Sequence, residues 1–256
     1  MSKNNQLRIL ITGEVRKEEI SKSIFNLPGA EVLFLPVIEL RMSVDEPDFQ
    51  RAYQARTDYI VFTSSFGVES YFQFCKVRDL PPLHPGQRMI AVGEKTAAAL
   101  KEAGYEKVIF PAEGTAAAIL RMLDSQTTEG NSFFLPRSEI GREELLTGLT
   151  EQGKQIYPVT MYTNSIPQYD GQKEFLESLK HQKPDWIVFQ SPSGVSNFLS
   201  LMEIGLDKQY FSGIKIAVIG RTTGDFLVSN GINYDFRPEK PSLDEIRSGI
   251  AGIEGV

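Results

Sequence analysis

Two stretches of the chain repeat one short motif. Residues 60–72 read IVFTSSFGVESYF and residues 187–199 read IVFQSPSGVSNFL, so Ile, Val, Phe, Ser, Gly and Val recur at matching positions. Each stretch is an apolar strand that ends in a hydroxyl-rich turn and continues into a helical pattern. A chain that encodes this strand, turn and helix twice is expected to contain two copies of one α/β unit.

The match extends beyond the motif at the same spacing. GEKT at 93–96 is matched by GRTT at 220–223, and Gly104 is matched by Gly231. Equal spacing across several elements favours a true repeat, although any two α/β halves share some strand composition.

Earlier in each copy the spacing slips, as a change of loop length would produce. PVIEL at 36–40 then aligns with PVTMY at 158–162, which places Tyr162 opposite Leu40. We therefore expect a tyrosine in the second copy where the first copy has an apolar residue.

Short apolar runs alternate with helical patterns along most of the chain. The expected strands lie at 8–12, 31–40, 58–63, 88–93, 107–110, 132–136, 155–163, 185–190, 214–220 and 233–236. Helical patterns fall between them, and Gly104, Gly153 and Gly231 stand where helix-ending glycines occur. Strands that are apolar throughout are typical of sheets covered on both faces. The alternation therefore predicts an α/β fold of doubly wound parallel sheets.

Composition restricts the class of protein. The chain has 256 residues, one cysteine (Cys75) and a net charge of −6. A single cysteine excludes an intrachain disulfide and a thiolate zinc site. No apolar run approaches the ~20 residues of a membrane span, and the N-terminus lacks a signal-peptide core. The negative charge disfavours nucleic acid binding. We expect a cytoplasmic protein that binds neither nucleic acid nor membrane.

Hydroxyl-rich turns follow the expected strands and open helices. They lie at 63–65, 93–96, 136–138, 191–194 and 220–223. In a parallel sheet, ligands gather at the carboxyl ends of the strands, and free amides at a helix N-terminus hold oxyanions well. Several such turns could hold several carboxylates or phosphates with few cations. For a single turn, simple helix capping by Ser or Thr is the alternative.

Familiar catalytic motifs are missing from the sequence. None of the turns is a Walker loop, a GxGxxG fingerprint or a GxSxG nucleophile elbow. The two histidines, His84 and His181, lie in hydrophilic or proline-rich connections, where we expect surface residues. Without a nucleophile elbow and a nearby histidine, a serine hydrolase is not expected. No cluster of side chains has metal-ligand spacing, so a metal centre is not expected either.

Arg137, Arg142 and Tyr162 are further candidates. Arg137 and Arg142 flank SEIG and could clamp a carboxylate in a bidentate manner. Arg142 could equally well cover its own helix. A tyrosine hydroxyl with a pKa of ~10 stays protonated at neutral pH and can donate a proton. The alternative for Tyr162 is an aromatic side chain that packs on a strand.

The residues together resemble the uroporphyrinogen-III synthase family. The matching elements are VFTSSFGV, IAVGEKTAAAL, LPRSEIGREELLTGLTEQGKQIYPVTMYTN, IVFQSPSGVSNF and IAVIGRTT, in the family's order and over nearly the whole chain. Each element is weakly specific alone. The combination of the long central stretch with the two hydroxyl turns and the GRTT turn is fairly specific.

The resemblance implies two similar doubly wound α/β domains joined by two strands, with the chain crossing over and back. It places residues 1–35 and 164–256 in one domain, 41–157 in the other, and the linker strands at 36–40 and 158–163. Family members act without a cofactor on hydroxymethylbilane, a linear tetrapyrrole. They remove its terminal hydroxyl as water, invert the last pyrrole ring and close the macrocycle, in a cleft between the domains. We expect a monomer with no metal.

The resemblance also implies roles for individual residues. Tyr162 would assist the leaving hydroxyl, and Arg137 remains a candidate for a substrate carboxylate. The residues that match the family's ligand-facing turns are Thr63, Ser64, Thr96, Ser191, Ser193, Thr222 and Thr223. One departure is Gly13, where the family often has an arginine, and Arg16 is the candidate that could compensate.

Two other classes of function stay open. A two-lobed binding protein for a small polyanion would use the same turns without chemistry. A sugar-phosphate isomerase would also grip oxyanions with Ser/Thr-rich turns, but such an enzyme normally adds a Glu or His base near them. We identify no Glu or His that the sequence positions as such a base near these turns.

Overall fold

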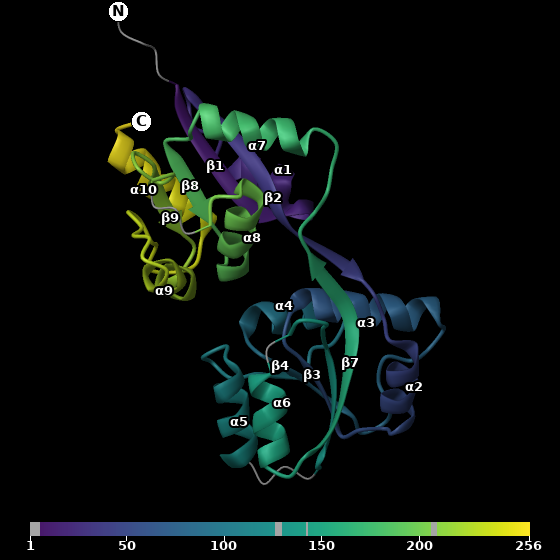
Figure 1. Ribbon diagram of the computed structural model, residues 1–256. Helices are drawn as coiled ribbons and strands as arrows, with labels where there is room; N and C mark the ends of the chain where they lie inside the picture. The colour runs from purple at the N-terminus through teal and green to yellow at the C-terminus, as the bar shows by residue number, and fades with distance from the viewer. Residues whose placement is uncertain (1–5, 126–129, 142, 206–208) are drawn as a thin grey trace, which may run out of the picture. The chain divides into compact units, whose positions relative to one another are not determined.

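The computed structural model describes residues 6–125, 130–141, 143–205 and 209–256. The chain divides into two compact units (Figure 1). Unit 1 comprises Met1–Glu39 and Ser165–Val256, and unit 2 comprises Leu40–Asn164. The chain therefore begins in unit 1, builds unit 2 and returns to complete unit 1.

Unit 1 has a parallel sheet with the strand order β2-β1-β8-β9. Its elements are β1 (Leu7–Glu14), η1 (Val15–Lys17), α1 (Glu18–Ile24), β2 (Ala30–Met42), α7 (Gln172–His181), β8 (Trp186–Phe189), α8 (Pro192–Met202), β9 (Lys215–Val218), α9 (Arg221–Ser229) and α10 (Leu243–Glu254). On one face, Leu10 and Ile187 pack with Leu179 of α7 and Phe198 of α8. The other face packs on α10, and both faces are covered as the apolar strands predict.

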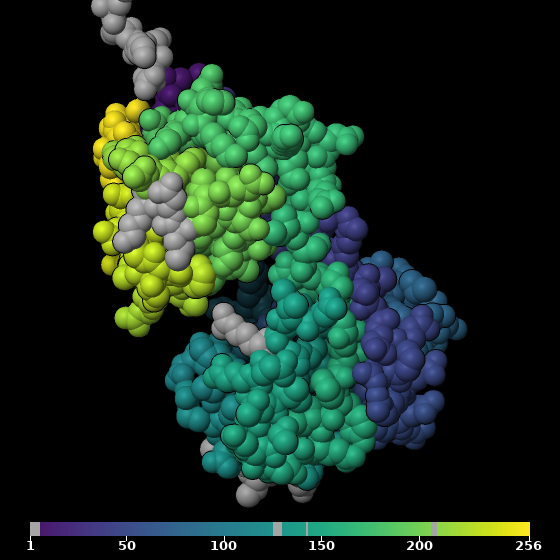
Figure 2. Space-filling model, viewed as in Figure 1, coloured from purple at the N-terminus to yellow at the C-terminus, as the bar shows by residue number. Residues whose placement is uncertain are grey.

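Unit 2 repeats this plan with the order β5-β4-β3-β6-β7. Its elements are α2 (Glu46–Gln54), β3 (Tyr59–Phe62), α3 (Ser65–Val77), β4 (Arg88–Ala91), α4 (Glu94–Glu102), β5 (Val108–Ile109), α5 (Ala116–Ser125), β6 (Ser132–Ser138), α6 (Glu144–Glu151) and β7 (Gln155–Ser165). Helices α2, α3 and α4 pack on one face, and α5 and α6 pack on the other. In Figure 2 the teal side chains of α5 and α6 lie on the visible surface of unit 2.

The expected doubly wound parallel α/β fold is confirmed, with one strand missing. Residues 233–236 do not form a strand, and Phe236 makes an isolated bridge with Ala217 instead. Gly104, Gly153 and Gly231 have the positive φ angles that end a helix.

A β-bulge occurs at the same place in both units. In β1 and β2, Gly13 pairs with Pro36 and Glu14 pairs with Ile38, so one residue of β2 is skipped. In β6 and β7, Arg137 pairs with Thr160 and Ser138 pairs with Tyr162, with one residue skipped in the same way. Bulges of this kind re-aim the side chains that follow them.

The bulges correct one alignment made from the sequence. Tyr162 corresponds in structure to Ile38, whereas the sequence alignment of PVIEL with PVTMY placed it opposite Leu40. The error arose because that alignment made Pro36 equivalent to Pro158. The residue next to the bulge is Pro36 in β2, paired with Gly13, and Thr160 in β7, paired with Arg137, so Pro36 is equivalent to Thr160. The matching residue is still apolar, so a tyrosine replaces an aliphatic side chain.

The sequence repeat and the two units are out of phase. The first copy supplies β1 and β2 to unit 1 but β3 and β4 to unit 2. The second copy supplies β6 and β7 to unit 2 but β8 and β9 to unit 1. Each unit thus combines the first two strands of one copy with the later strands of the other, which is why the chain passes between units twice.

Candidate functional site

The turn after β3 is organised by Ser64. Ser64 is the N-cap of α3, with extended backbone, and its Oγ accepts the backbone N–H of Gly67 at 3.0 Å. A serine at this position satisfies one of the free amides of the first helical turn. Thr63, the residue before it, is exposed. The structure therefore assigns helix capping to Ser64 and leaves the hydroxyl of Thr63 available.

Tyr162 lies beside this cap. Its hydroxyl oxygen is 2.8 Å from Ser64 Oγ, and either oxygen can be the donor. The residue is 7% exposed, and burial raises the pKa of its phenol, while the hydrogen bond with Ser64 acts in the opposite direction. Tyr162 is therefore held neutral at physiological pH with its hydroxyl fixed in place.

Three neighbours shape the surroundings of the Tyr162 ring. Phe66 packs edge-on against it, with ring centroids 5.0 Å apart and planes at 89°. A Cβ at Gly67 would lie 3.1 Å from Ser64 Oγ and 3.7 Å from Tyr162 Cε1, so this close approach favours glycine. Ser138, the partner of Tyr162 in the strand pairing, has a buried Oγ that finds no hydrogen-bond partner among the residues that the structure describes. The tyrosine thus stands in a tightly packed, partly polar environment.

The turn after β8 repeats the cap in unit 1. Ser191 is the N-cap of α8, and its Oγ accepts the N–H of Gly194 at 3.0 Å. Ser193 is exposed, and its Oγ lies 3.2 Å from Ser191 Oγ. A Cβ at Gly194 would lie 3.1 Å from Ser191 Oγ, the same distance as at Gly67. The two caps match in geometry, but a Cβ at Gly194 would meet Val37 Cγ2 at 3.6 Å, where a Cβ at Gly67 would meet Tyr162.

The threonines after β4 and β9 differ in exposure. Thr96 of α4 is 4% exposed and Thr223 of α9 is 2% exposed, and they occupy equivalent positions. Thr222 is exposed in the first turn of α9. Thr222 can therefore reach a ligand directly, whereas Thr96 and Thr223 are packed inside their units in this structure.

Arg137 is already paired within unit 2. Its guanidinium donates to Glu143 Oε1 at 2.5 Å and Oε2 at 3.2 Å, and also to the carbonyl of Gly141. This hydrogen bond from Arg137 lowers the pKa of the Glu143 carboxyl. A substrate carboxylate at Arg137 would have to displace Glu143. Arg142, the other candidate of the sequence analysis, lies outside the described residues.

The end of β1 has an acidic group where the family resemblance suggested a cation. Glu14 is 9% exposed and accepts from Arg16 through the backbone N–H at 3.1 Å and through Nε at 3.0 Å. The Arg16 side chain is therefore bound to Glu14 in this structure. Gly13 leaves room for Gln190, whose Nε2 donates to the carbonyl of Thr12 at 2.9 Å.

Within each unit, parallel strands bring their carboxyl ends to one edge of the sheet. Unit 2 places there the turns with Thr63 and Ser64, Arg137 and Tyr162, and unit 1 places there the turns with Ser191, Ser193 and Thr222. Sequence reasoning missed the partners Phe66, Ser138 and Glu143. Phe66 and Ser138 both neighbour Tyr162, and the sequence does not give the register of β6 and β7 that decides which residues neighbour this tyrosine.

Two features are absent from the residues that the structure describes. Among residues 6–125, 130–141, 143–205 and 209–256, no group of three or more His, Cys, Asp and Glu side chains is placed to hold a metal ion. In the same part of the chain, no helix has the length and apolar character that a membrane crossing requires.

Comparison with protein families gives one match that spans most of the chain. A family model described as "Uroporphyrinogen-III synthase HemD" matches residues 21–247. A relative from Methanothermobacter thermautotrophicus, named "Putative uroporphyrinogen-III synthase", is 27% identical over 227 residues, which are 87% of this chain and 89% of the relative.

Solved structures with similar folds have the same name. A uroporphyrinogen III synthase mutant from Thermus thermophilus has a TM-score of 0.73 and 22% identity, covering 97% of this chain and 99% of its own. The uroporphyrinogen-III synthetase from Helicobacter pylori has a TM-score of 0.59 and 20% identity, covering 97% of this chain and 100% of its own. At this identity the likeness concerns the fold.

Proposed function

Because the chain belongs to the uroporphyrinogen-III synthase family, we propose that it cyclises hydroxymethylbilane with inversion of the terminal pyrrole ring, and that Tyr162 donates the proton. The activity is that of a cyclising lyase of tetrapyrrole biosynthesis that needs no cofactor. Its substrate is a small tetrapyrrole. The proposal adds the residue roles below, and also a monomeric state and a cytoplasmic location.

The hydrogen bond between Ser64 and Tyr162 is the observation that supports the proposed proton transfer. Ser64 Oγ accepts the N–H of Gly67, which uses one of its lone pairs, and the serine proton remains available. When Ser64 donates this proton to Tyr162 Oη, the phenol proton is free to point at the leaving hydroxyl of the substrate. The C–O bond then breaks, the phenol proton leaves with the hydroxyl as water, and Ser64 stabilises the tyrosinate.

The protonation state of Tyr162 fits this role. Burial raises its pKa, so the phenol is neutral over the physiological range and carries a proton whenever substrate binds. The Ser64 hydrogen bond lowers the pKa and so makes the proton easier to release. A positioned donor of this kind contributes about 10²–10⁴ in rate. Ring closure afterwards returns a proton to the tyrosinate from the pyrrole carbon that loses it.

The exposed hydroxyls hold the substrate carboxylates in this proposal. Hydroxymethylbilane has acetate and propionate groups on every ring, and Thr63, Ser193 and Thr222 present hydroxyls beside the N-termini of α3, α8 and α9. Amide groups and hydroxyls bind carboxylates there with little need for cations. This suits a chain with a net charge of −6.

The second contribution to the rate is orientation of the substrate, because the enzyme must fold the flexible tetrapyrrole so that its two ends meet. Orientation of this kind supplies up to ~7–11 kcal/mol in ideal intramolecular reactions. Carboxylate contacts at the exposed hydroxyls hold the rings in this proposal, and the proton donor belongs to unit 2. Direct closure without inversion gives the type I isomer, so control of the substrate conformation decides which isomer forms.

The test is incubation with freshly prepared hydroxymethylbilane, followed by oxidation and chromatographic separation of the isomers. An excess of type III over type I product supports the proposed reaction. Type I product alone, at the rate of the uncatalysed control, rejects it. Saturable binding of uroporphyrinogen III without any acceleration would identify a binding protein instead.

A further inference from the structure

Unit 1 contains a pocket whose lining differs from the strand-end turns. It has a volume of about 430 Å³ and is lined by Val15, Glu18, Phe34, Pro36, Glu39, Pro167, Gln168, Tyr169 and Phe175. This volume lies in the range of small-molecule sites, which are mostly apolar with a few placed polar groups. We propose that this pocket binds a small organic cation, held by aromatic rings and the carboxylate of Glu18.

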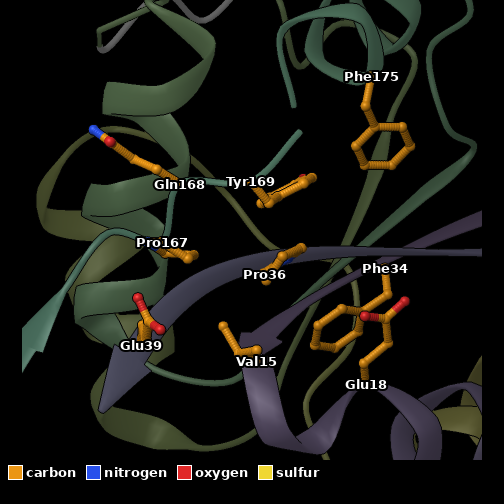
Figure 3. A pocket seen from close by; sticks show the side chains of 9 residues that line it. All are labelled: Val15, Glu18, Phe34, Pro36, Glu39, Pro167, Gln168, Tyr169 and Phe175. Carbon is orange, nitrogen blue, oxygen red and sulfur yellow. The ribbon is translucent and has the colours of Figure 1, made fainter. Parts of the chain in front are cut away.

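The walls of the pocket are aromatic on several sides. Figure 3 shows the rings of Phe34, Tyr169 and Phe175 around a common space, contributed by β2, the loop after β7 and helix α7. Phe34 is 5% exposed, so it forms a fixed floor, while Tyr169 is 38% exposed at the entrance. Aromatic faces attract cations because the ring quadrupole is negative above and below the ring plane.

The charged groups in the lining are both acidic. Glu18 and Glu39 both line the pocket, and Figure 3 shows their side chains toward different ends of it. The charge of Glu18 reaches Tyr169, since it contributes, after burial, to the raised pKa of that phenol. The acidic lining therefore disfavours an anion and favours a cation in contact with the same rings.

Lys22 competes with a bound cation for the carboxylate of Glu18. Its ammonium lies 2.6 Å from Glu18 Oε1, and both side chains are partly exposed. Such an exposed pair is weak, so a cation within the pocket can displace it at little cost. Lys22 also shows that the Glu18 carboxylate accepts an ammonium group in this position.

The proposal does not depend on the tetrapyrrole reaction. The substrate has a carboxylate on every side chain, and two glutamates in the lining repel such groups. The pocket lies entirely within unit 1, whereas Ser64 and Tyr162 belong to unit 2. Loss of cation binding and loss of cyclisation are therefore separate observations.

The experiment uses choline as the cation and 3,3-dimethyl-1-butanol as its neutral isostere, in which a carbon atom replaces the charged nitrogen. Each is titrated into the ¹⁵N-labelled full chain at constant ionic strength, and amide shifts are followed. We expect saturable shifts at Tyr169 and Phe175 with choline, and binding at least ~3-fold weaker with the isostere. Equal binding of the two, or no saturable shift with choline, would overturn the proposal.

Matched variants separate the pocket from general charge effects. Glu18→Gln and Glu19→Gln remove one negative charge each from neighbouring residues of α1, but Glu19 is not in the pocket lining. We expect Glu18→Gln to weaken choline binding by about threefold to tenfold, and Glu19→Gln to change it by less than about twofold. Equal effects would show a nonspecific attraction and reject the site.

Two further variants test the aromatic wall and the competitor. Tyr169→Ala removes an exposed ring and should weaken choline binding by about threefold to tenfold. Lys22→Gln removes the competing ammonium and should strengthen binding by about twofold. Weaker binding in Lys22→Gln would contradict the role of Glu18. The amide spectra of the free variants establish that each is folded.

Discussion

The hydroxyl oxygens of Ser64 and Tyr162 lie 2.8 Å apart, and the same Ser64 oxygen caps α3 through Gly67. One atom therefore links the geometry of a helix N-terminus to the proposed proton donor. In unit 1 the equivalent cap at Ser191 has the aliphatic side chain of Val37 beside Gly194, where unit 2 has Tyr162 beside Gly67. The two units share one capped turn, and the proposed proton donor belongs to unit 2.

Replacement of Tyr162 with phenylalanine should slow formation of the type III isomer by about 10²–10⁴. The ring and its packing against Phe66 remain, while the proton donor is lost. Product affinity should change by less than about threefold, because the carboxylate-binding turns are untouched. The rate is measured by isomer separation after oxidation, and affinity by titration with uroporphyrinogen III.

Thermal unfolding provides the control for that variant. Phenylalanine leaves Ser64 Oγ bonded to Gly67, so the midpoint should fall by only a few degrees. A Tyr162→Phe enzyme with the wild-type rate would remove this residue from the mechanism.

Replacement of Ser64 and Ser191 with alanine gives a matched pair. Each change removes a cap with the same 3.0 Å hydrogen bond, so each should cost about 1 kcal/mol of unfolding free energy. Ser64→Ala should in addition lower kcat by about tenfold or more, because Tyr162 loses its partner. Ser191→Ala should act on KM, since its turn binds substrate in the proposal.

Steady-state kinetics and urea unfolding of both variants check this difference. Equal losses of kcat in the two variants would mean that Ser64 acts only as a cap. A Ser64→Thr variant keeps the hydroxyl and should recover most of the rate.

The strands of the fold were predictable because they are apolar throughout. IVF at 60–62 and at 187–189 lies inside β3 and β8, and a parallel sheet buried on both faces requires such runs. The strand predicted at residues 233–236 was wrong, because Phe236 makes an isolated bridge with Ala217 and the side chain of Asp235 accepts the N–H of Ile216. Local composition did not decide whether that segment would pair.

Site partners were harder to predict because they depend on register. The bulge opposite Ser138 decides that Tyr162, 98 positions from Ser64 in the chain, brings its hydroxyl to the cap. A shift of one residue would turn the tyrosine to the other face of the sheet. The turn motifs identified the edge of the sheet, but the exposure of Thr222 and the burial of Thr223 follow from helix phase after Gly220.

Thr222 and Thr223 should respond differently to replacement with valine. Thr222 is exposed, so Thr222→Val should weaken uroporphyrinogen III binding by about threefold to tenfold with little change in unfolding free energy. Thr223 is 2% exposed, so Thr223→Val should act mainly on stability. Titration and urea unfolding distinguish the two, and a reversed order would mean that the helix rearranges when ligand binds.

Glu143→Gln should strengthen product binding. The wild-type carboxylate occupies Arg137, and the hydrogen bond from Arg137 lowers the pKa of Glu143, so the pair persists at neutral pH. Glutamine frees the guanidinium with little change in stability, because the Glu143 side chain is 65% exposed. We expect affinity to rise by about twofold to fivefold, and Arg137→Gln to lower it by a similar factor. Affinity unchanged in both variants would exclude Arg137 from the binding site.

The raised pKa of Tyr162 predicts a specific pH dependence of stability. An unfolded chain ionises its tyrosines near pH 10, whereas burial keeps Tyr162 neutral in the folded protein to higher pH. The contribution of Tyr162 to the free energy of unfolding is therefore fully present below pH 10, and it is lost as the pH rises through the pKa of the folded state. Urea unfolding at pH 7, 9 and 10.5 should show that wild type loses more free energy than Tyr162→Phe between pH 9 and 10.5. Between pH 7 and 9 the two proteins should lose equal amounts, since the phenol is neutral in both states of the chain. If wild type instead gained unfolding free energy relative to Tyr162→Phe already below pH 9, Tyr162 would ionise in the folded protein near neutrality, and the phenol would then be unsuited to donate a proton.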